Sequence, residues 1–292
     1  MISTAVILSA LELGCIYALV ALALFLSFRI LNIADMTTDG SFTLGCAVSA
    51  TVAVAGYPIL ALPAAMAAGA AAGFITAWLQ TKFRIPSILA GIITNTGLYT
   101  VNLAVMGFSS NVNMLKTDTI FSLLKPFLGT GYKLIPAFLL TALVAVALVL
   151  FLNTRMGLSI RATGDNPDMV RASSINTGLT VTIGLALSNS ITALSGAVLA
   201  QYQKTADINL GTGMVIIGLA SLIIGETVFR GRKIWVKALG AVVGCIIYRF
   251  IIAIALRLDL PSECLKLVSA IIVAIAIALP TIKKKQGGKA KC

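Results

Sequence analysis

The sequence predicts an all-α, polytopic membrane protein with about nine transmembrane helices, within a range of eight to ten. Hydrophobic residue types make up 59% of the 292 residues, and charged types only 11%. A soluble domain carries about 25% charged residues, so water is not the main solvent of this chain. Since one helical pass needs about 20 apolar residues, no stretch remains for a soluble domain, and we expect residues 1–292 to form a single membrane domain.

Nine apolar segments follow one another along the chain. They are Thr4–Phe28, Gly40–Gly56, Pro58–Leu79, Pro86–Phe108, Leu134–Leu152, Leu179–Gln201, Gly213–Phe229, Val236–Leu256 and Cys264–Pro280. The first lacks the basic start and the cleavage site of a signal peptide, so we expect it to be a retained span. The second and seventh are short, which predicts broken helices, because irregular backbone at membrane depth is tolerated only inside protein or beside a watery cavity.

The charges of the loops predict that the N-terminus lies outside and the C-terminus in the cytoplasm. With nine passes in this sense, 15 Lys and Arg residues lie inside, six lie outside, and Arg249 lies within the eighth segment. Cytoplasmic loops carry such an excess of positive charge. The lysine-rich tail at 281–292 is expected to lie on the cytoplasmic side beside anionic lipid; a solvated tail with no specific partner is the alternative.

Composition argues against several classes of function. The net charge is +12, but the basic residues are spread over the breaks between apolar segments, so we expect no nucleic-acid partner. The chain has no histidine, and its five cysteines lack metal-ligand spacing. The sequence therefore predicts no catalytic residue, no metal site and no cofactor in this chain.

Two pairs of glycines are spaced by one helical turn, Gly69 with Gly73 and Gly240 with Gly244. Small residues at this spacing let helix backbones approach closely in lipid. We interpret each pair as a helix–helix seam or a subunit contact; generic packing within the membrane is the alternative.

The first polar break lies between the first two apolar segments. Asn32, Asp35 and Thr38 in this break are candidates for lining a polar path, since a carboxylate at membrane depth usually faces a cavity or a partner. A plain turn is the alternative for Asp35. Asp39 or Thr38 is expected to cap the helix that follows.

A second break, Ala206–Gly218, is similar to the first. Asp35 aligns with Asp207, and, after one inserted residue, Gly40 and Gly45 align with Gly213 and Gly218. In the predicted orientation the two breaks open to opposite faces, which is typical of an inverted repeat. Chance similarity in an apolar sequence of low diversity is the alternative. Asp207 and Asn209 join the candidates for the path.

Three polar residues within apolar segments complete the candidate path: Thr94, Asn95 and Asn189. Their alternative role is hydrogen bonding between helices, which contributes about 0.6 kcal/mol on average in membranes. Glu226 lies four residues before Arg230 and is interpreted as its local ion-pair partner.

The loop at 153–178 is predicted to be cytoplasmic and to contain a short amphipathic helix. Asp165 or Asn166 can cap this helix, Pro167 suits its first position, and Asp168 complements its dipole. Gly178 is expected to help end it. A short helix of this kind is poorly stable alone, so the loop predicts a cytoplasmic partner.

The same loop carries a family resemblance. The stretch Gly157–Arg171 resembles the cytoplasmic coupling loop of permeases in the branched-chain amino-acid and ribose importer superfamily, and Leu13–Leu22 is similar to that family's opening helix. The form of Asp35–Gly45 looks closest to permeases that accompany tryptophan/tyrosine-type binding proteins. Asp35 and Met36 depart from the wider family, where many members have a small residue or histidine followed by glycine.

The resemblance implies a permease subunit of a bacterial ABC importer in the cytoplasmic membrane. A second copy of the permease, expected as a homodimer, would complete the path; a cytoplasmic ATPase dimer would bind ATP-Mg, and an extracytoplasmic binding protein would deliver the substrate. No phosphate loop occurs in this chain, so hydrolysis is expected from the partner. The residues implied to couple to the ATPase are Gly164, Asp165, Asn166, Pro167, Asp168, Met169 and Arg171.

Other classes of function remain open at this point. A secondary transporter driven by an ion gradient is the alternative, since Asp35 and Asp207 would suit ion binding. A scaffold gains nothing from paired polar breaks, and an enzyme lacks a nucleophile–base pair. By resemblance alone, the substrate is expected to be an aromatic or other hydrophobic amino acid.

Overall fold

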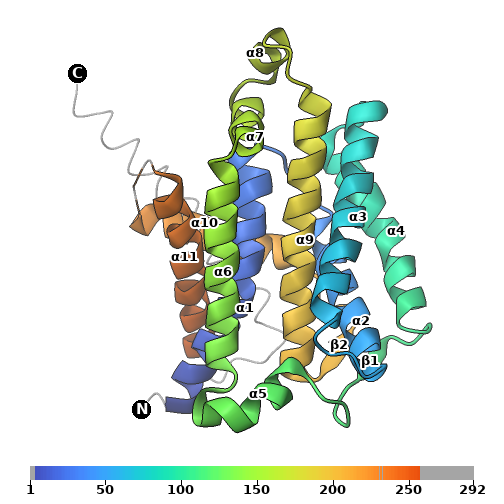
Figure 1. Ribbon diagram of the computed structural model, residues 1–292, viewed down its shortest axis with the longest axis vertical. Coiled ribbons are helices and arrows are strands. Elements are labelled where there is room, and N and C mark those ends of the chain that lie inside the picture. Colours follow the sequence, from blue (N-terminus) through green and yellow to red (C-terminus); the bar gives the residue numbers. More distant parts are fainter. Residues whose placement is uncertain (1–3, 230, 232, 257–292) are drawn as a thin grey trace.

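The chain folds into an elongated bundle of helices, which confirms the predicted fold class. The computed structural model describes residues 4–229, 231 and 233–256. Helix α8 projects from one end of the bundle and α5 lies at the other (Figure 1). These are called the α8 end and the α5 end below.

Six helices in the described part of the chain are long and apolar enough to cross a membrane. They are α1 with the π-helix that continues it (Thr4–Leu24 and Phe25–Ile30), α3 (Ala61–Lys82), α4 (Ser87–Val105), α6 (Leu134–Leu152), α9 (Thr177–Gln203) and α11 (Ile234–Leu256). Two apolar helices are shorter, α2 (Thr38–Val54) and α10 (Met214–Val228). The other elements are β1 (Asn111–Asn113), α5 (Ile120–Leu128), the 3-10 helix Gly129–Gly131, α7 (Arg155–Asp165), α8 (Pro167–Ala172) and β2 (Thr205–Asp207).

The predicted apolar segments match these helices closely. Eight of the nine correspond to helices, and α6 has the predicted bounds. The ninth segment, Cys264–Pro280, and the basic tail at 281–292 lie outside the described residues, so the count of nine spans is not confirmed. Strands β1 and β2 form a small antiparallel pair at the α5 end, where Asn111 faces Asp207.

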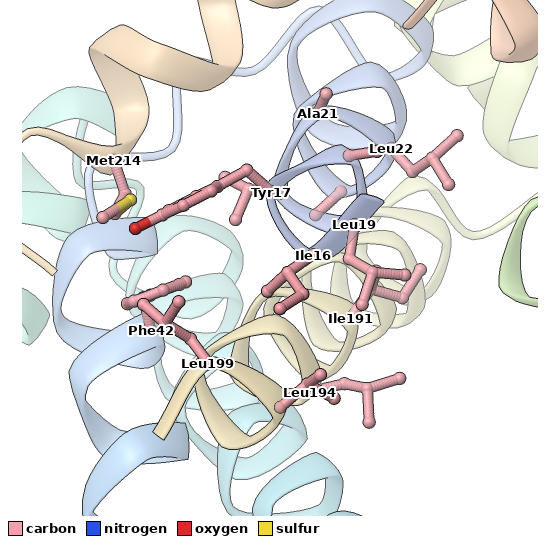
Figure 2. Packing of buried hydrophobic residues seen from close by; sticks show 14 of the residues in the cluster. Ile16, Tyr17, Leu19, Ala21, Leu22, Phe42, Ile191, Leu194, Leu199 and Met214 are labelled. Carbon is pink, nitrogen blue, oxygen red and sulfur yellow. The ribbon is translucent and has the colours of Figure 1, made fainter. Parts of the chain in front are cut away.

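Helices α2 and α10 are shorter than a full membrane pass. Helix α2 has 17 residues and α10 has 15. At 1.5 Å per residue they are about 25 and 22 Å long, less than the ~30 Å of a bilayer's hydrocarbon core. Met214, the first residue of α10, lies near Tyr17 in the middle of α1 (Figure 2). Both breaks are therefore real interruptions inside the bundle.

The structure contains an inverted repeat, in which the first and third helices of the two copies share the same offset. Residues 4–30 and 177–203 form the first helices of the two copies, and Ala61 and Ile234 begin the third helices, so each pair is 173 residues apart. The short helices α2 and α10 occupy the second position in each copy. The copies run in opposite directions, because α1 ends beside α7 at the α8 end, whereas α9 begins after α8 and ends at the α5 end.

The core is centred on α1. Every residue from Gly14 to Ser27 is buried, and Ile16 and Leu19 pack against Ile191 and Leu194 of α9 (Figure 2). Hydroxyl groups join the neighbouring helices to this core: Ser188 donates to the carbonyl oxygen of Ala23 at 2.8 Å. Such bonds replace water as the partner of polar groups at membrane depth.

The paired glycines form seams within the chain. A methyl group added at Gly73 would overlap the carbonyl oxygen of Leu185 in α9, and one added at Gly244 would overlap that of Ser221 in α10. Of the two readings of the glycine pairs, the structure favours helix–helix seams. The seam of Gly69 and Gly73 joins the two repeats, since α3 packs on α9, whereas the seam of Gly240 and Gly244 lies within the second repeat, between α11 and α10.

Candidate functional site

A buried polar cluster surrounds Asp35 in the first break. Asp35 is 2% exposed, and its carboxylate accepts hydrogen bonds from the Nδ2 of Asn189 at 2.6 Å and from the backbone N–H of Thr37 at 2.9 Å. The Oδ1 of Asn189 in turn accepts from the hydroxyl of Ser41 at 2.7 Å. Thr37 and Thr76 share a further hydrogen bond of 2.8 Å. The cluster ties the break to α9, α2 and α3.

The cluster fixes the path of an irregular segment inside the bundle. A buried carboxylate is costly unless it is hydrogen-bonded, and Asp35 receives neutral donors on both oxygens. Among the described residues no cation lies within ion-pair distance of it. The segment between α1 and α2 is thus held by local polar bonds, and any movement of α9 against this segment must break the bond between Asp35 and Asn189.

The other candidates of the first repeat lie around the start of α2. Thr38 is buried and donates to the carbonyl oxygen of Asp35, while Thr94 donates to Ala90 within its own helix. Asn95 faces Gly40. Asn32 is exposed and has a φ of 56°. The structure therefore brings Asp35, Thr38 and Asn189 together and leaves Asn32 and Thr94 outside their hydrogen-bonded cluster.

Asp207 and Asn209 lie apart from that cluster, near the α5 end. Asp207 belongs to β2, and its carboxylate accepts from the backbone N–H of Asn209 at 2.8 Å. Within the described part of the chain, no hydrogen bond connects either of them with Asp35. The two breaks are nevertheless in contact through other residues.

Asp39 connects the two short helices, α2 and α10. Its carboxylate accepts hydrogen bonds from the backbone N–H groups of Gly213 and Val215, both at 2.9 Å, at the first turn of α10. The hydroxyl of Thr43 in α2 also accepts from the N–H of Gly211 at 3.1 Å. The expectation that Asp39 or Thr38 caps α2 is wrong: α2 has Thr37 at its N-cap, with no side-chain capping bond.

One carboxylate therefore serves two helix starts. Asp39 lies in the first turn of α2 and caps α10, and the N-terminal ends of both helices carry partial positive charge. The local sequence could not reveal this, because the N–H groups that Asp39 binds belong to the other repeat. The sequence also missed Asn102 of α4, which is 1% exposed and donates to the carbonyl oxygen of Gly40 in another helix at 3.2 Å.

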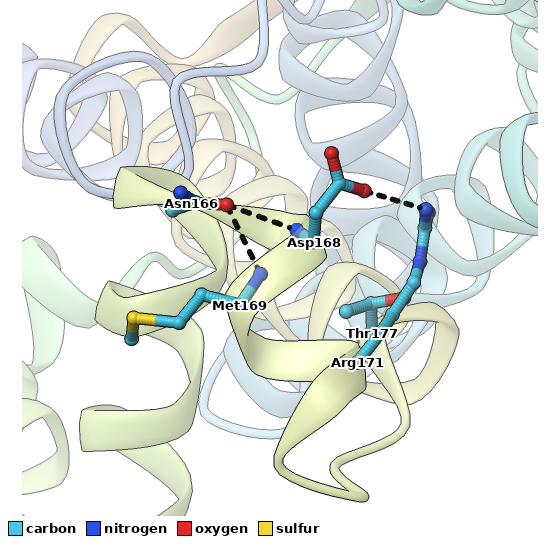
Figure 3. A network of polar contacts seen from close by, with 5 residues as sticks. All are labelled: Asn166, Asp168, Met169, Arg171 and Thr177. Carbon is cyan, nitrogen blue, oxygen red and sulfur yellow. Dashed lines mark hydrogen bonds and ion pairs between the residues drawn. The ribbon is translucent and has the colours of Figure 1, made fainter.

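Helices α7 and α8 form a compact elbow at the α8 end. The predicted short helix exists as α8, and Asn166 is its cap, accepting from the N–H groups of Asp168 and Met169 at 3.1 Å each (Figure 3). Pro167 occupies the first helical position, as predicted. Arg171 pairs with Asp168 at 3.2 Å and donates to Thr177 of α9 (Figure 3). Gly178 lies inside α9, so its predicted role in ending the element is wrong.

Helix α7 was not foreseen, and it anchors the elbow to the bundle. Ile160 is fully buried, and the hydroxyls of Thr163 and Thr180 share a hydrogen bond of 2.9 Å. Gly164 packs against the backbone of Ile30 and Leu31, where the first break begins. Gly164 is therefore part of the anchor, whereas Met169, which is 59% exposed, belongs to the free surface of α8.

A crevice of about 760 Å³ lies beside the elbow. It is lined by Gln80, Thr81, Arg84 and Ile85 near the end of α3, and by Thr163, Pro167, Arg171 and Thr177 of the elbow and α9. Glu226 of α10 forms an ion pair with Arg29 at 2.6 Å. The predicted partner of Glu226, Arg230, lies outside the described residues.

No cluster of metal-binding side chains occurs among the described residues. The three described cysteines, Cys15, Cys46 and Cys245, are free and buried in apolar helices. The residues of the polar cluster, the contact at Asp39 and the elbow act through hydrogen bonds and packing.

The fold and these sites define a polytopic membrane protein with two broken helices and a helical elbow at one end. The model of one family, the permease component of branched-chain amino acid transport systems, matches residues 6–279. The chain belongs to this family of ABC transporter permeases.

Particular relatives cover nearly all of the chain. A tyrosine transport system permease protein of Clostridioides difficile (strain R20291) is 34% identical over 93% of this chain and 90% of its own length. An uncharacterized protein of Rickettsia prowazekii, RP368, is 33% identical over 96% of this chain and 99% of its own length. The ribose import permease protein RbsC of Haemophilus influenzae is 23% identical over 93% of this chain and 83% of its own length. No solved structure matches the chain.

Proposed function

We propose that the chain is the membrane-spanning subunit of a bacterial ABC importer for an amino acid, tyrosine or another aromatic or hydrophobic one. Membership of the permease family supports the importer, and the similarity to the tyrosine transport system permease protein of Clostridioides difficile supports the substrate. The chain itself carries no ATPase motif, so a separate subunit binds and hydrolyses ATP-Mg.

The observation that carries this proposal is the elbow. Helix α8 projects from the bundle with an exposed apolar side chain at Met169, yet its orientation is fixed by the Asn166 cap and by Arg171 on α9. A rigid projecting helix of this kind gains its remaining stability from a docked partner. We assign that partner as a cytoplasmic ATPase dimer that grips one α8 from each of two permease copies.

The elbow also offers a direct route from the partner to the interior. Gly164 of α7 lies on Ile30 and Leu31, and the chain then enters the first break and reaches Asp35. A shift of the elbow driven by ATP binding would move the start of this break. The bond between Asp35 and Asn189, and the contact of Asp39 with α10, are the links that must rearrange for the path to open.

The proposed orientation follows from charge. The α8 end carries Arg29, Lys82, Arg84, Arg155, Arg161 and Arg171. We assign this end to the cytoplasm, with the N-terminus outside and the C-terminus inside, and the α5 end to an extracytoplasmic binding protein. We expect a homodimer of the permease to form the complete path.

Co-purification tests the proposal with a matched pair of methionines. The Met169→Glu variant changes the exposed surface of α8, whereas Met156→Glu changes a less exposed methionine, 37% exposed, at the start of α7. Each tagged permease is solubilised from its own membranes, and the bound proteins are identified. We expect wild type and Met156→Glu to retain an ATPase with a phosphate loop and Met169→Glu to lose it.

Two results would contradict this assignment. Retention of the ATPase by Met169→Glu would remove α8 as the docking element. A permease that purifies alone and accumulates substrate in liposomes under an ion gradient would establish the secondary transporter instead.

A further inference from the structure

Arg249 is a cation inside the membrane-spanning part of the bundle that neither the fold nor the elbow explains. It lies in α11, well within a helix that is apolar enough to cross a membrane, and it is partly exposed. Charged residues at such positions are costly, face the bundle interior or a cavity, and mark functional sites. Among the described residues no carboxylate lies within ion-pair distance of Arg249.

The guanidinium of Arg249 is held by an aromatic stack. Its central carbon lies 3.8 Å from the centroid of the Tyr17 ring. Tyr17 in turn stacks on Phe42 of α2, with centroids 6.1 Å apart and planes at 7°, and Met214 of α10 lies beside this pair (Figure 2). The stack fixes the plane of the guanidinium. Its Nε is buried and has no hydrogen-bond partner.

The direction of the side chain also argues against an anchor to the nearby membrane surface. Side chains of a helix lean toward its N-terminus, and α11 begins at the α8 end and runs toward the α5 end. Arg249 lies in the later part of α11, so its side chain leans away from the α5 end, and its contact with Tyr17 places it inside the bundle. An arginine that reached for lipid headgroups would extend toward the closer surface.

The inverted repeat shows what this position does in the other copy. With the offset of 173 residues, Arg249 corresponds to Thr76 of α3. Thr76 bonds to Thr37 beside Asp35, so the position borders the break of its own repeat. Arg249 thus occupies, in the second repeat, the place from which a side chain reaches the irregular segment where an amino acid would pass.

We infer that Arg249 binds the carboxylate of the transported amino acid on its way through the bundle. This rests on the proposed function and adds a residue and a ligand group to it. A guanidinium presents paired N–H donors that match a carboxylate, and one whose plane is fixed and whose buried Nε has no partner is prepared for such a ligand. The stack on Tyr17 lets Arg249 remain in place when no substrate is bound.

The test compares an acid with its amide. The complex of permease and ATPase is placed in nanodiscs, and equilibrium binding of the 20 standard amino acids is measured. The amino acid that wild type binds most tightly is then compared with its carboxamide, which lacks the negative charge. The variants are Arg249→Gln, Arg249→Lys, and Lys237→Gln as a control that removes a positive charge earlier in the same helix.

We expect Arg249→Gln to weaken binding of the acid roughly 10- to 100-fold, the range for a lost charge-assisted pair, and to leave binding of the amide unchanged. Arg249→Lys keeps the charge without the paired donors and should show a smaller loss, again for the acid only. Lys237→Gln should bind both compounds as wild type does. If Arg249→Gln does not fold, the acid-specific loss in Arg249→Lys decides the question.

Four results would overturn the inference. Equal weakening for acid and amide would make Arg249 a packing residue, and unchanged binding of the acid would remove it from the site. If Arg249→Gln loses a bound anionic lipid in native mass spectrometry while amino-acid binding persists, its ligand is a lipid phosphate. If wild type binds no amino acid, the proposed substrate class is overturned together with the role of Arg249. The other three results overturn only the role of Arg249.

Discussion

Asp35 and Asp39, two carboxylates inside the bundle, accept hydrogen bonds from helices that lie far away in the sequence. Asp39 of α2 binds the N–H groups of Gly213 and Val215 in α10, and Asp35 binds Asn189 of α9. The residues around Asp39 predict a helix start, and α2 does start at Thr38. The pattern cannot say which N–H groups a carboxylate reaches, because that depends on a helix far away in the chain.

Removing the carboxylate of Asp39 should destabilise the protein. In Asp39→Ala, the N–H groups of Gly213 and Val215 lose their acceptor inside the bundle, so we expect the free energy of unfolding to fall by about 2 kcal/mol. Unfolding in mixed detergent micelles measures this change. The control is Asp118→Ala, since Asp118 is exposed at the α5 end. Equal stability of the two variants would show that Asp39 contributes nothing as a cap.

Among the helices, close approach of backbones decides where the elements lie. Gly69 and Gly73 place α3 directly against the carbonyl groups of α9, and Gly240 and Gly244 place α11 against α10. In lipid, packing at such small residues replaces the hydrophobic effect as the force between helices. The spacing of the glycines predicts a seam, but only the structure identifies its partner.

A bulky side chain in the seam should prevent folding. Leucine at position 73 would meet the backbone of Leu185, which cannot move without shifting α9, whereas a side chain at Gly97 of α4 meets no atom within 4 Å. We expect the free energy of unfolding to fall by about 3 kcal/mol or more in Gly73→Leu and to change little in Gly97→Leu. Fluorescence-detected size-exclusion chromatography of the two variants compares their folded fractions. A monodisperse Gly73→Leu protein at wild-type yield would argue against the seam.

In the whole molecule, the inverted repeat brings the two breaks together. The first break enters from the α8 end and the second from the α5 end, and α2 and α10 start beside each other at Asp39. This arrangement places irregular backbone in the middle of the bundle, where alternating access requires a site that both faces can reach. The elbow contacts the first break directly at Leu31.

The proposed orientation predicts which end an impermeant reagent reaches. The native cysteines are first replaced by serine. In intact cells, we expect a membrane-impermeant maleimide to label the Lys116→Cys variant at the α5 end and not the Ser173→Cys variant at the α8 end, although both positions are exposed. Permeabilised cells serve as the control in which both variants react. Labelling of Ser173→Cys alone in intact cells would reverse the orientation.

The sequence by itself determined the fold class, eight of the helical segments, the capped helix α8 and the family, because each of these depends on local composition or on a contiguous motif. It also indicated both breaks, through glycines and polar residues in short apolar segments. Only the tertiary structure decided that Asp39 caps α10, that Asn189 holds Asp35, and that Arg249 stacks on Tyr17. These contacts join residues of different helices, and in lipid their pairing is set by how closely the backbones approach, which hydrophobicity along the chain does not encode.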